Sequence, residues 1–344
     1  MKRFVFVFLF LLCLSKTASA ADNVLNIYTW AGYLPDAVIT QFETETGIRV
    51  NLATYVNNEV LYAKLKANPE SAYDIIMPSS YFISRLRKQA LIQKIDHSKL
   101  AHYQNINPVF LSKEHDPANE YSIPYLWNGT GIAYNTRYHA RKSVNIWQDF
   151  WLPRYRDQLL VLDDTRECFS MALIALGYSV NDQDPAHIKA AFEKLKALMP
   201  NIKLFNMDAQ RSIYLDEDIT IGMGLNGDIF LAKAQNPYLQ FIYPKEGFVI
   251  TLDSIAIPVG AKHVENAHRF IDFVLRAEIA KQITLESGFS TPNLAAKELL
   301  PLQIRTDPIL YPDAEILKKG QIQTDVGEAT SLYEKYFERL KLEE

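Results

Sequence analysis

Acidic and aromatic residues stand near the ends of several predicted strands, where ligands of open parallel sheets bind. Two aromatic residues follow the first strand, one follows another strand, two acids stand at a strand-to-helix junction, and one acid opens a further strand. Carboxylates pair with ammonium groups, while aromatic faces contact methylenes and stabilise cations. The combination favours an organic cation as ligand. The residues are Trp30, Tyr33, Tyr81, Asp164, Glu167 and Asp253.

Each of these residues also has a purely structural interpretation. The spacing of Asp164 and Glu167 matches a helix capping box. A helix N-terminus repels cations, so an amine bound there needs both carboxylates to outweigh the local dipole. Trp30 and Tyr33 could be core residues, and Asp253 could belong to a turn.

Motifs for other chemistries are absent from the sequence. The seven histidines show no i, i+4 pair, and neither HExxH nor CxxC occurs, so we expect no metal site. There is no G-x-S-x-G, no P-loop and no G-x-G-x-x-G, and we expect no cofactor. Cys168 lies near a predicted helix N-terminus, which would lower its pKa, but flanking Phe169 and Met171 favour a buried structural thiol.

Composition indicates an ordinary globular protein of about two domains. The 344 residues are 48% hydrophobic and 22% charged, which excludes a disordered or collagen-like chain. Asp and Glu number 40 against 36 Lys and Arg, for a net charge of −4. We therefore expect no nucleic-acid partner, since such proteins carry a basic excess.

Residues 1–20 have the pattern of a secretory signal peptide. Lys2 and Arg3 precede an apolar run over residues 5–14, and Ala18-Ser19-Ala20 forms a cleavage site. Cleavage removes three basic residues and no acid, so the net charge falls from −4 to −7. It also leaves Cys168 as the one cysteine, which excludes an intrachain disulfide. We expect an exported periplasmic protein without membrane insertion, because no later segment reaches 18 apolar residues.

Strands and amphipathic helices alternate along the mature chain, which predicts a parallel α/β sheet. No long linker divides the two sets of elements, so the chain should cross between two lobes more than once, with a small-molecule cleft between them. We expect strands at 25–30, 49–55, 74–77, 159–162, 219–223 and 254–258, and helices at 35–47, 59–66, 80–89, 166–176, 186–198, 229–234, 264–275 and 278–287 and at the C-terminus.

A series of short segments carries a family resemblance. They run in the same order over some 300 residues, and the chain resembles the periplasmic spermidine/putrescine-binding proteins of ABC polyamine transporters. The segments are YTWAGY (28–33), QFETETGI (41–48), YDIIMPSSY (73–81), YSIPYLW (121–127), DDTRE (163–167), LDSIAIP (252–258), TPNLAA (291–296) and QTDVG (323–327).

The resemblance implies the two-lobed α/β fold of type II periplasmic binding proteins, with the ligand in the interlobe cleft. An N-terminal lobe would comprise residues 22–131 plus 252–297, and a C-terminal lobe residues 132–251 plus 298–344. The implied partners are a polyamine ligand and the permease subunits of an inner-membrane ABC transporter. The implied ligand-binding residues are Trp30, Tyr33, Ser79, Tyr81, Asp164, Glu167, Asp253 and Gln323.

Several positions depart from the family pattern. Gly32 stands where an acid is usual, Leu225 where a Trp is expected, and Phe289 replaces a Tyr. Thr251 occupies another aromatic position. The acids of the second lobe and Asp253 are retained, so an organic polycation remains the expected ligand. Fewer carboxylates and aromatic faces favour putrescine over spermidine.

The expected function is therefore capture of a polyamine for transport, without catalysis. One alternative is a binding protein or sensor for another small organic cation. The other is a transferase on the same fold that would use Cys168 as its nucleophile.

Overall fold

The N-terminal part of the chain builds a three-stranded parallel sheet in the computed structural model, which describes residues 23–68, 73–141 and 143–342. β1 (Val24–Trp30) lies between β2 (Arg49–Tyr55) and β3 (Ile75–Ile76). The predicted signal peptide lies outside the described residues. The expected helix before β2 is confirmed as α1 (Asp36–Thr46), which ends at Gly47 with φ 69°, a conformation that favours glycine.

A seven-stranded sheet holds most of the remaining strands, in the order β12-β10-β5-β8-β6-β7 with β9 also paired to β5. A separate pair is formed by β4 (Ile92–Gln93) and β11 (Ile257–Pro258). The strands of the larger sheet are β5 (Ile123–Asn135), β6 (Leu159–Val161), β7 (Ile202–Phe205), β8 (Ile221–Leu225), β9 (Leu239–Ile242), β10 (Phe248–Ile255) and β12 (Gly320–Ile322).

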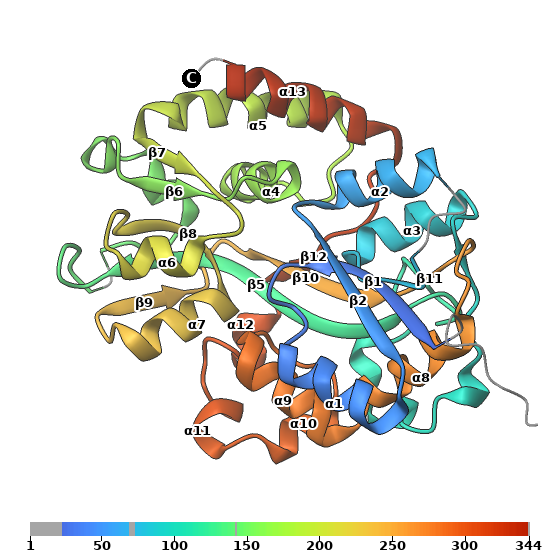
Figure 1. The fold of residues 1–344 in the computed structure, drawn as a ribbon. Coiled ribbons are helices and arrows are strands. Elements are labelled where there is room, and N and C mark those ends of the chain that lie inside the picture. The colour runs from blue at the N-terminus through green and yellow to red at the C-terminus, as the bar shows by residue number, and fades with distance from the viewer. Residues whose placement is uncertain (1–22, 69–72, 142, 343–344) are drawn as a thin grey trace, which may run out of the picture.

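The expectation of a parallel sheet is wrong at the centre of this larger sheet. β5 pairs antiparallel with β8, β9 and β10, while the pairs that β6 makes are parallel. All 13 residues of β5 are buried. The sequence of β5 therefore lacks the alternation of apolar and polar residues that marks a strand with one exposed face. β5 and β10 are the long strands that sweep across the middle of the molecule in Figure 1.

Helices cover the sheets, and each helix expected from the sequence is present, whereas α6, α10, α11 and α12, whose bounds follow, were not expected. α13, the C-terminal helix, lies beside α5 (Figure 1), and the rings of Phe192 and Tyr336 stack between them with centroids 4.7 Å apart. The helices after α1 are α2 (Asn58–Ala67), α3 (Ser80–Lys88), α4 (Thr165–Ala175), α5 (Pro185–Leu198), α6 (Gln210–Leu215), α7 (Asn226–Gln235), α8 (Val264–Val274), α9 (Ala277–Ser287), α10 (Leu294–Leu299), α11 (Leu302–Arg305), α12 (Ala314–Leu317) and α13 (Thr330–Leu342).

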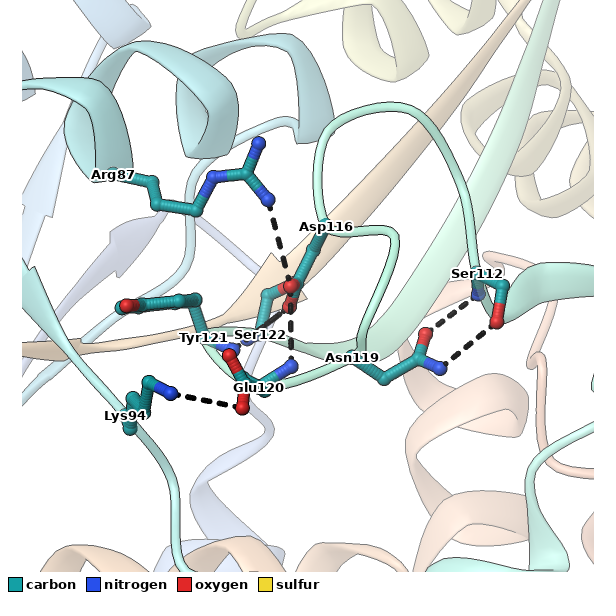
Figure 2. A network of polar contacts seen from close by, with 8 residues as sticks. All are labelled: Arg87, Lys94, Ser112, Asp116, Asn119, Glu120, Tyr121 and Ser122. Carbon is teal, nitrogen blue, oxygen red and sulfur yellow. Dashed lines mark hydrogen bonds and ion pairs between the residues drawn. The ribbon is translucent and has the colours of Figure 1, made fainter.

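A buried acid fixes the loop that leads into β5 (Figure 2). The carboxylate of Asp116 accepts hydrogen bonds from the backbone N–H groups of Glu120, Tyr121 and Ser122 at 2.8–3.1 Å. Arg87 on α3 lies 3.8 Å from the same carboxylate. The loop is thereby tied to α3 just before β5 begins.

Candidate binding cavity

The loops at the strand ends border an open cavity, with about 710 Å³ of free space when the solvent at its mouth is counted. Trp30 is the last residue of β1, and Tyr33 lies just beyond it. Ser79 and Tyr81 follow β3, and the remaining acids and amide come from β10, the N-terminus of α4 and the segment after β12. All eight residues predicted from the sequence line this one cavity; their role as ligand contacts stays a prediction. They are Trp30, Tyr33, Ser79, Tyr81, Asp164, Glu167, Asp253 and Gln323.

Asp253 is a deeply buried part of the cavity wall, with 1% of its surface exposed. The interpretation of Asp253 as a turn residue is wrong, because it stands inside β10 at a register shift between Asp253 and Ser254. Its carboxylate accepts hydrogen bonds from Tyr33 Oη at 2.8 Å and from Ser79 Oγ at 2.7 Å. Burial raises the pKa of Asp253 to about 6, although both hydroxyl donors oppose the shift.

Asn58, on α2, holds the hydroxyls of the same wall in place. Its Nδ2 donates to Ser79 Oγ and to Tyr81 Oη, each at 3.1 Å, and its Oδ1 accepts from Ser79 N at 3.0 Å. The backbone bridge between Ser79 and Asp253 brings the end of β3 against β10. A fixed set of hydroxyls therefore surrounds the Asp253 carboxylate.

Trp30 and Tyr33 serve both as cavity wall and as packing residues. The Trp30 indole donates to Met77 O at 3.0 Å, and its ring lies 4.6 Å from that of Tyr55. The ring of Tyr33 lies 5.0 Å from that of Phe289. The packing interpretation of Trp30 and Tyr33 is therefore correct, and both residues also line the cavity, where contact with a ligand stays a prediction.

Asp164 and Glu167 stand where the capping-box pattern put them, at the N-terminus of α4. Asp164 Oδ1 accepts from Glu167 N at 2.9 Å, so the capping interpretation is correct for Asp164. Glu167 Oε2 is buried and has no hydrogen-bond partner among the described residues. Burial, reinforced by the neighbouring Asp164, raises the pKa of Glu167 to about 8. The hydroxyls of Thr130 and Thr251 and the charge of Arg166 oppose this rise without cancelling it.

Sequence reasoning missed four polar residues of the cavity, namely Asn58, Asn128, Asp208 and Asp228. Asp228 follows β8 in the first turn of α7, at the same kind of junction as Asp164, so that rule could have found it. Burial raises its pKa to about 7. With these additions, five carboxylates line the cavity, and the lining residues within the described chain include no Lys, Arg or His.

The departures from the family pattern lie at or near this cavity. Leu225, Thr251 and Phe289 line it, so their side chains shape the available space. Gly32 does not line it, although Ala31 does. Gly32 has φ 74°, so an acid placed there would be strained, at a cost of about 1 kcal/mol, even though no atom stands within 4 Å of its added Cβ.

Cys168 lies apart from the cavity lining and is fully buried. Its Sγ donates to Leu162 O at 3.0 Å. Burial, with Asp164 nearby, raises the pKa of the thiol well above its ordinary value. The structural interpretation of this cysteine is correct, and an activated thiolate at the helix N-terminus is not supported.

Residues 23–68, 73–141 and 143–342 contain neither a metal-binding cluster nor a membrane-spanning helix. No group of three or more His, Cys, Asp or Glu side chains there is placed to hold a metal ion. No helix in those ranges is both long and apolar enough to cross a bilayer.

Comparison with known proteins places the chain in a class. Residues 37–311 match the bacterial extracellular solute-binding protein family. The spermidine/putrescine-binding periplasmic protein of Escherichia coli K12 is 46% identical over 96% of this chain and 95% of its own length. The putrescine-binding periplasmic protein of the same organism is 32% identical over 88% of this chain and 87% of its own.

Solved structures agree with this assignment. A putative spermidine/putrescine ABC transporter protein from Listeria monocytogenes superposes with a TM-score of 0.90, at 34% identity over 94% of this chain and all of its own. The chain is thus a bacterial extracellular solute-binding protein with the two-lobed α/β fold of that class. Within the class, it belongs to the spermidine/putrescine-binding periplasmic protein family, which confirms the resemblance drawn from the sequence.

Proposed function

We propose that this protein is the periplasmic component of an ABC polyamine uptake system, which captures a polyamine in the cavity and delivers it unchanged to the permease. One observation carries the proposal: five carboxylates and several aromatic rings line a cavity whose described lining includes no basic side chain. Dications complement such a site, whereas anions and neutral sugars would leave buried carboxylates unpaired.

The proposed ligand lies across the cavity, with an ammonium group at each end. Asp253, supported by Tyr33 and Ser79, binds one end. Glu167 and Asp164 bind the other end from α4. Trp30, Tyr81 and Gln323 complete the proposed contacts along the methylene chain, since all of them line the same cavity.

Calorimetry of the mature protein against putrescine, cadaverine, spermidine and spermine tests this function. We expect saturable binding of at least one of these amines at one molecule per chain. Anionic control compounds, such as succinate, should give no binding heat. If none of the four amines binds, the polyamine assignment is wrong and another organic cation must be sought.

The preference for a shorter or a longer polyamine should depend on the aromatic faces that are missing at two cavity positions. Leu225 and Thr251 offer no π face to a middle ammonium group, and each such face is worth roughly 0.5–2 kcal/mol. We therefore expect putrescine to bind at least as tightly as spermidine. Leu225→Trp should shift the preference towards spermidine by about threefold or more, whereas Leu225→Met should not, because methionine fills space without a π face. Wild-type protein that prefers spermidine tenfold would contradict this account.

Lobe closure should accompany binding. Lys88 Nζ on α3 lies 2.8 Å from Asp325 Oδ2, and the Arg166 guanidinium lies 5.2 Å from the centre of the Tyr81 ring. Both contacts join segments that the sequence assigns to different lobes, and we propose that they form as the lobes close about β5 and β10. Small-angle scattering should give a smaller radius of gyration with saturating putrescine. An unchanged radius in a sample shown by calorimetry to be saturated would contradict closure.

A further inference from the structure

Asn128 presents a buried acceptor atom to the cavity, at a position where no sequence motif predicts a ligand contact. The residue lies in the middle of β5, and its side chain is 3% exposed. Its Oδ1 has no hydrogen-bond partner among the described residues. Buried polar atoms are almost always paired, so an unpaired one that lines a cavity points to a ligand.

The amide orientation of Asn128 follows from its neighbour. Tyr33 Oη donates its proton to Asp253 Oδ2 at 2.8 Å, which leaves the Tyr33 oxygen as an acceptor. Asn128 Nδ2 faces that oxygen at 3.4 Å. Turning the amide over would oppose two acceptors. The carbonyl oxygen of Asn128 therefore stays free.

A second free acceptor lies nearby. Thr251 is the direct cross-strand partner of Asn128 in the antiparallel pairing of β10 with β5, so both side chains lie on one face of the sheet. Thr251 Oγ1 donates to Glu167 Oε1 at 3.4 Å. The other oxygen of Glu167, Oε2, is the second buried acceptor without a described partner.

Among these polar residues, Thr251 stands where the family pattern has an aromatic residue. Aromatic rings bind ammonium groups through charge and accept fully alkylated ones readily. Carbonyl and carboxylate oxygens instead require N–H donors, and leaving them unpaired in a buried site is costly. A cavity wall of aromatic rings and a wall of oxygen acceptors therefore select different cationic groups at the end of a ligand.

We propose that Asn128 contacts the ligand and, together with Glu167, selects cationic heads that carry several N–H donors, such as a primary ammonium or a guanidinium, over fully alkylated ones. This rests on the proposed function and specifies the chemistry of one end of its site. One N–H of the head would donate to Asn128 Oδ1 and another to Glu167 Oε2. A trimethylammonium head satisfies neither.

The wild-type protein provides the first test, by calorimetry with putrescine and with (4-aminobutyl)trimethylammonium. Both are dications of the same chain length, but one end of the second carries no N–H. We expect the trimethyl compound to bind at least about thirtyfold more weakly. Equal affinities would overturn the proposal, because they would show recognition by charge alone. Failure of both to bind would instead contradict the polyamine function.

The Asn128→Leu variant provides the second test. Leucine has the same branching and number of side-chain heavy atoms as asparagine, although it is larger, and it removes both the acceptor and the Nδ2 that faces Tyr33 Oη. Putrescine should therefore bind roughly tenfold more weakly, and discrimination against the trimethyl compound should shrink. Ser254→Ala is the matched control: Ser254 Oγ is also buried without a described partner, but it does not line the cavity. Its affinities should equal those of the wild type. An Asn128→Leu protein with wild-type affinity and wild-type discrimination would overturn the assignment.

Discussion

Replacing Asp253 by asparagine should weaken putrescine binding by about 2–4 kcal/mol, because one ammonium group loses its buried anionic partner. The substitution keeps the shape of the side chain and an oxygen that Ser79 or Tyr33 can donate to. The loss should therefore fall on ligand affinity, which calorimetry measures, rather than on folding.

Asp163→Asn is the matched control for this variant. Asp163 stands beside Asp164 but is exposed, does not line the cavity, and pairs with Lys341 Nζ at 2.7 Å. It changes the net charge by the same amount as Asp253→Asn, so long-range effects cancel in the comparison. An Asp253→Asn protein whose affinity stays within twofold of wild type would remove Asp253 from the set of ligand contacts.

Binding should weaken strongly as pH falls from 8 to 5.5. Burial raises the pKa of Asp253 to about 6, of Asp228 to about 7 and of Glu167 to about 8. A bound ammonium, whose own pKa is near 10, favours the ionised carboxylates, so binding releases protons. Each competing proton costs roughly tenfold in affinity per pH unit below its pKa.

Calorimetric titrations between pH 5.5 and 8 measure this dependence. Glu167→Gln should flatten the profile between pH 7 and 8, while Asp163→Asn should leave it unchanged. Affinity that is constant across the range would contradict the titration of these carboxyls on binding.

The same raised pKa values determine whether the stability of the folded protein rises or falls with pH. Between the ordinary pKa, 3.8 for Asp and 4.5 for Glu, and the folded value, the folded protein binds more protons than the unfolded chain, so these carboxyls lower stability as pH rises. The melting temperature gained from saturating putrescine should therefore be larger at pH 8 than at pH 6. The reverse order in thermal melts would show that the ligand does not engage these groups.

The smaller sheet and most helices could be predicted because their signals are local. β2 alternates, and α1 is bounded by Pro35 and Gly47, so a few residues decide each element. β5 could not be predicted, because burial on both faces removes its periodicity and its partners β8, β9 and β10 are distant in the chain. For the same reason, the antiparallel pairing at the centre of the larger sheet could not be predicted.

The cavity residues also divide into those that local sequence patterns identify and those that depend on the folded structure. Asp164 and Glu167 stand at a strand-to-helix junction, a position that local rules identify. Asn128 is an ordinary amide within a strand, and its importance depends on Thr251, more than 100 residues later, being its cross-strand partner. The folded core determines which oxygens are left without hydrogen-bond partners, and no sequence pattern predicts this.

A crystal structure of the protein with putrescine tests the central claim most directly, that an organic dication lies between Asp253 and the acids of α4. We predict one ammonium nitrogen within hydrogen-bond distance of Asp253 and the other within hydrogen-bond distance of Glu167. Putrescine bound outside this cavity, or lying in it with neither carboxylate in contact, would contradict the account.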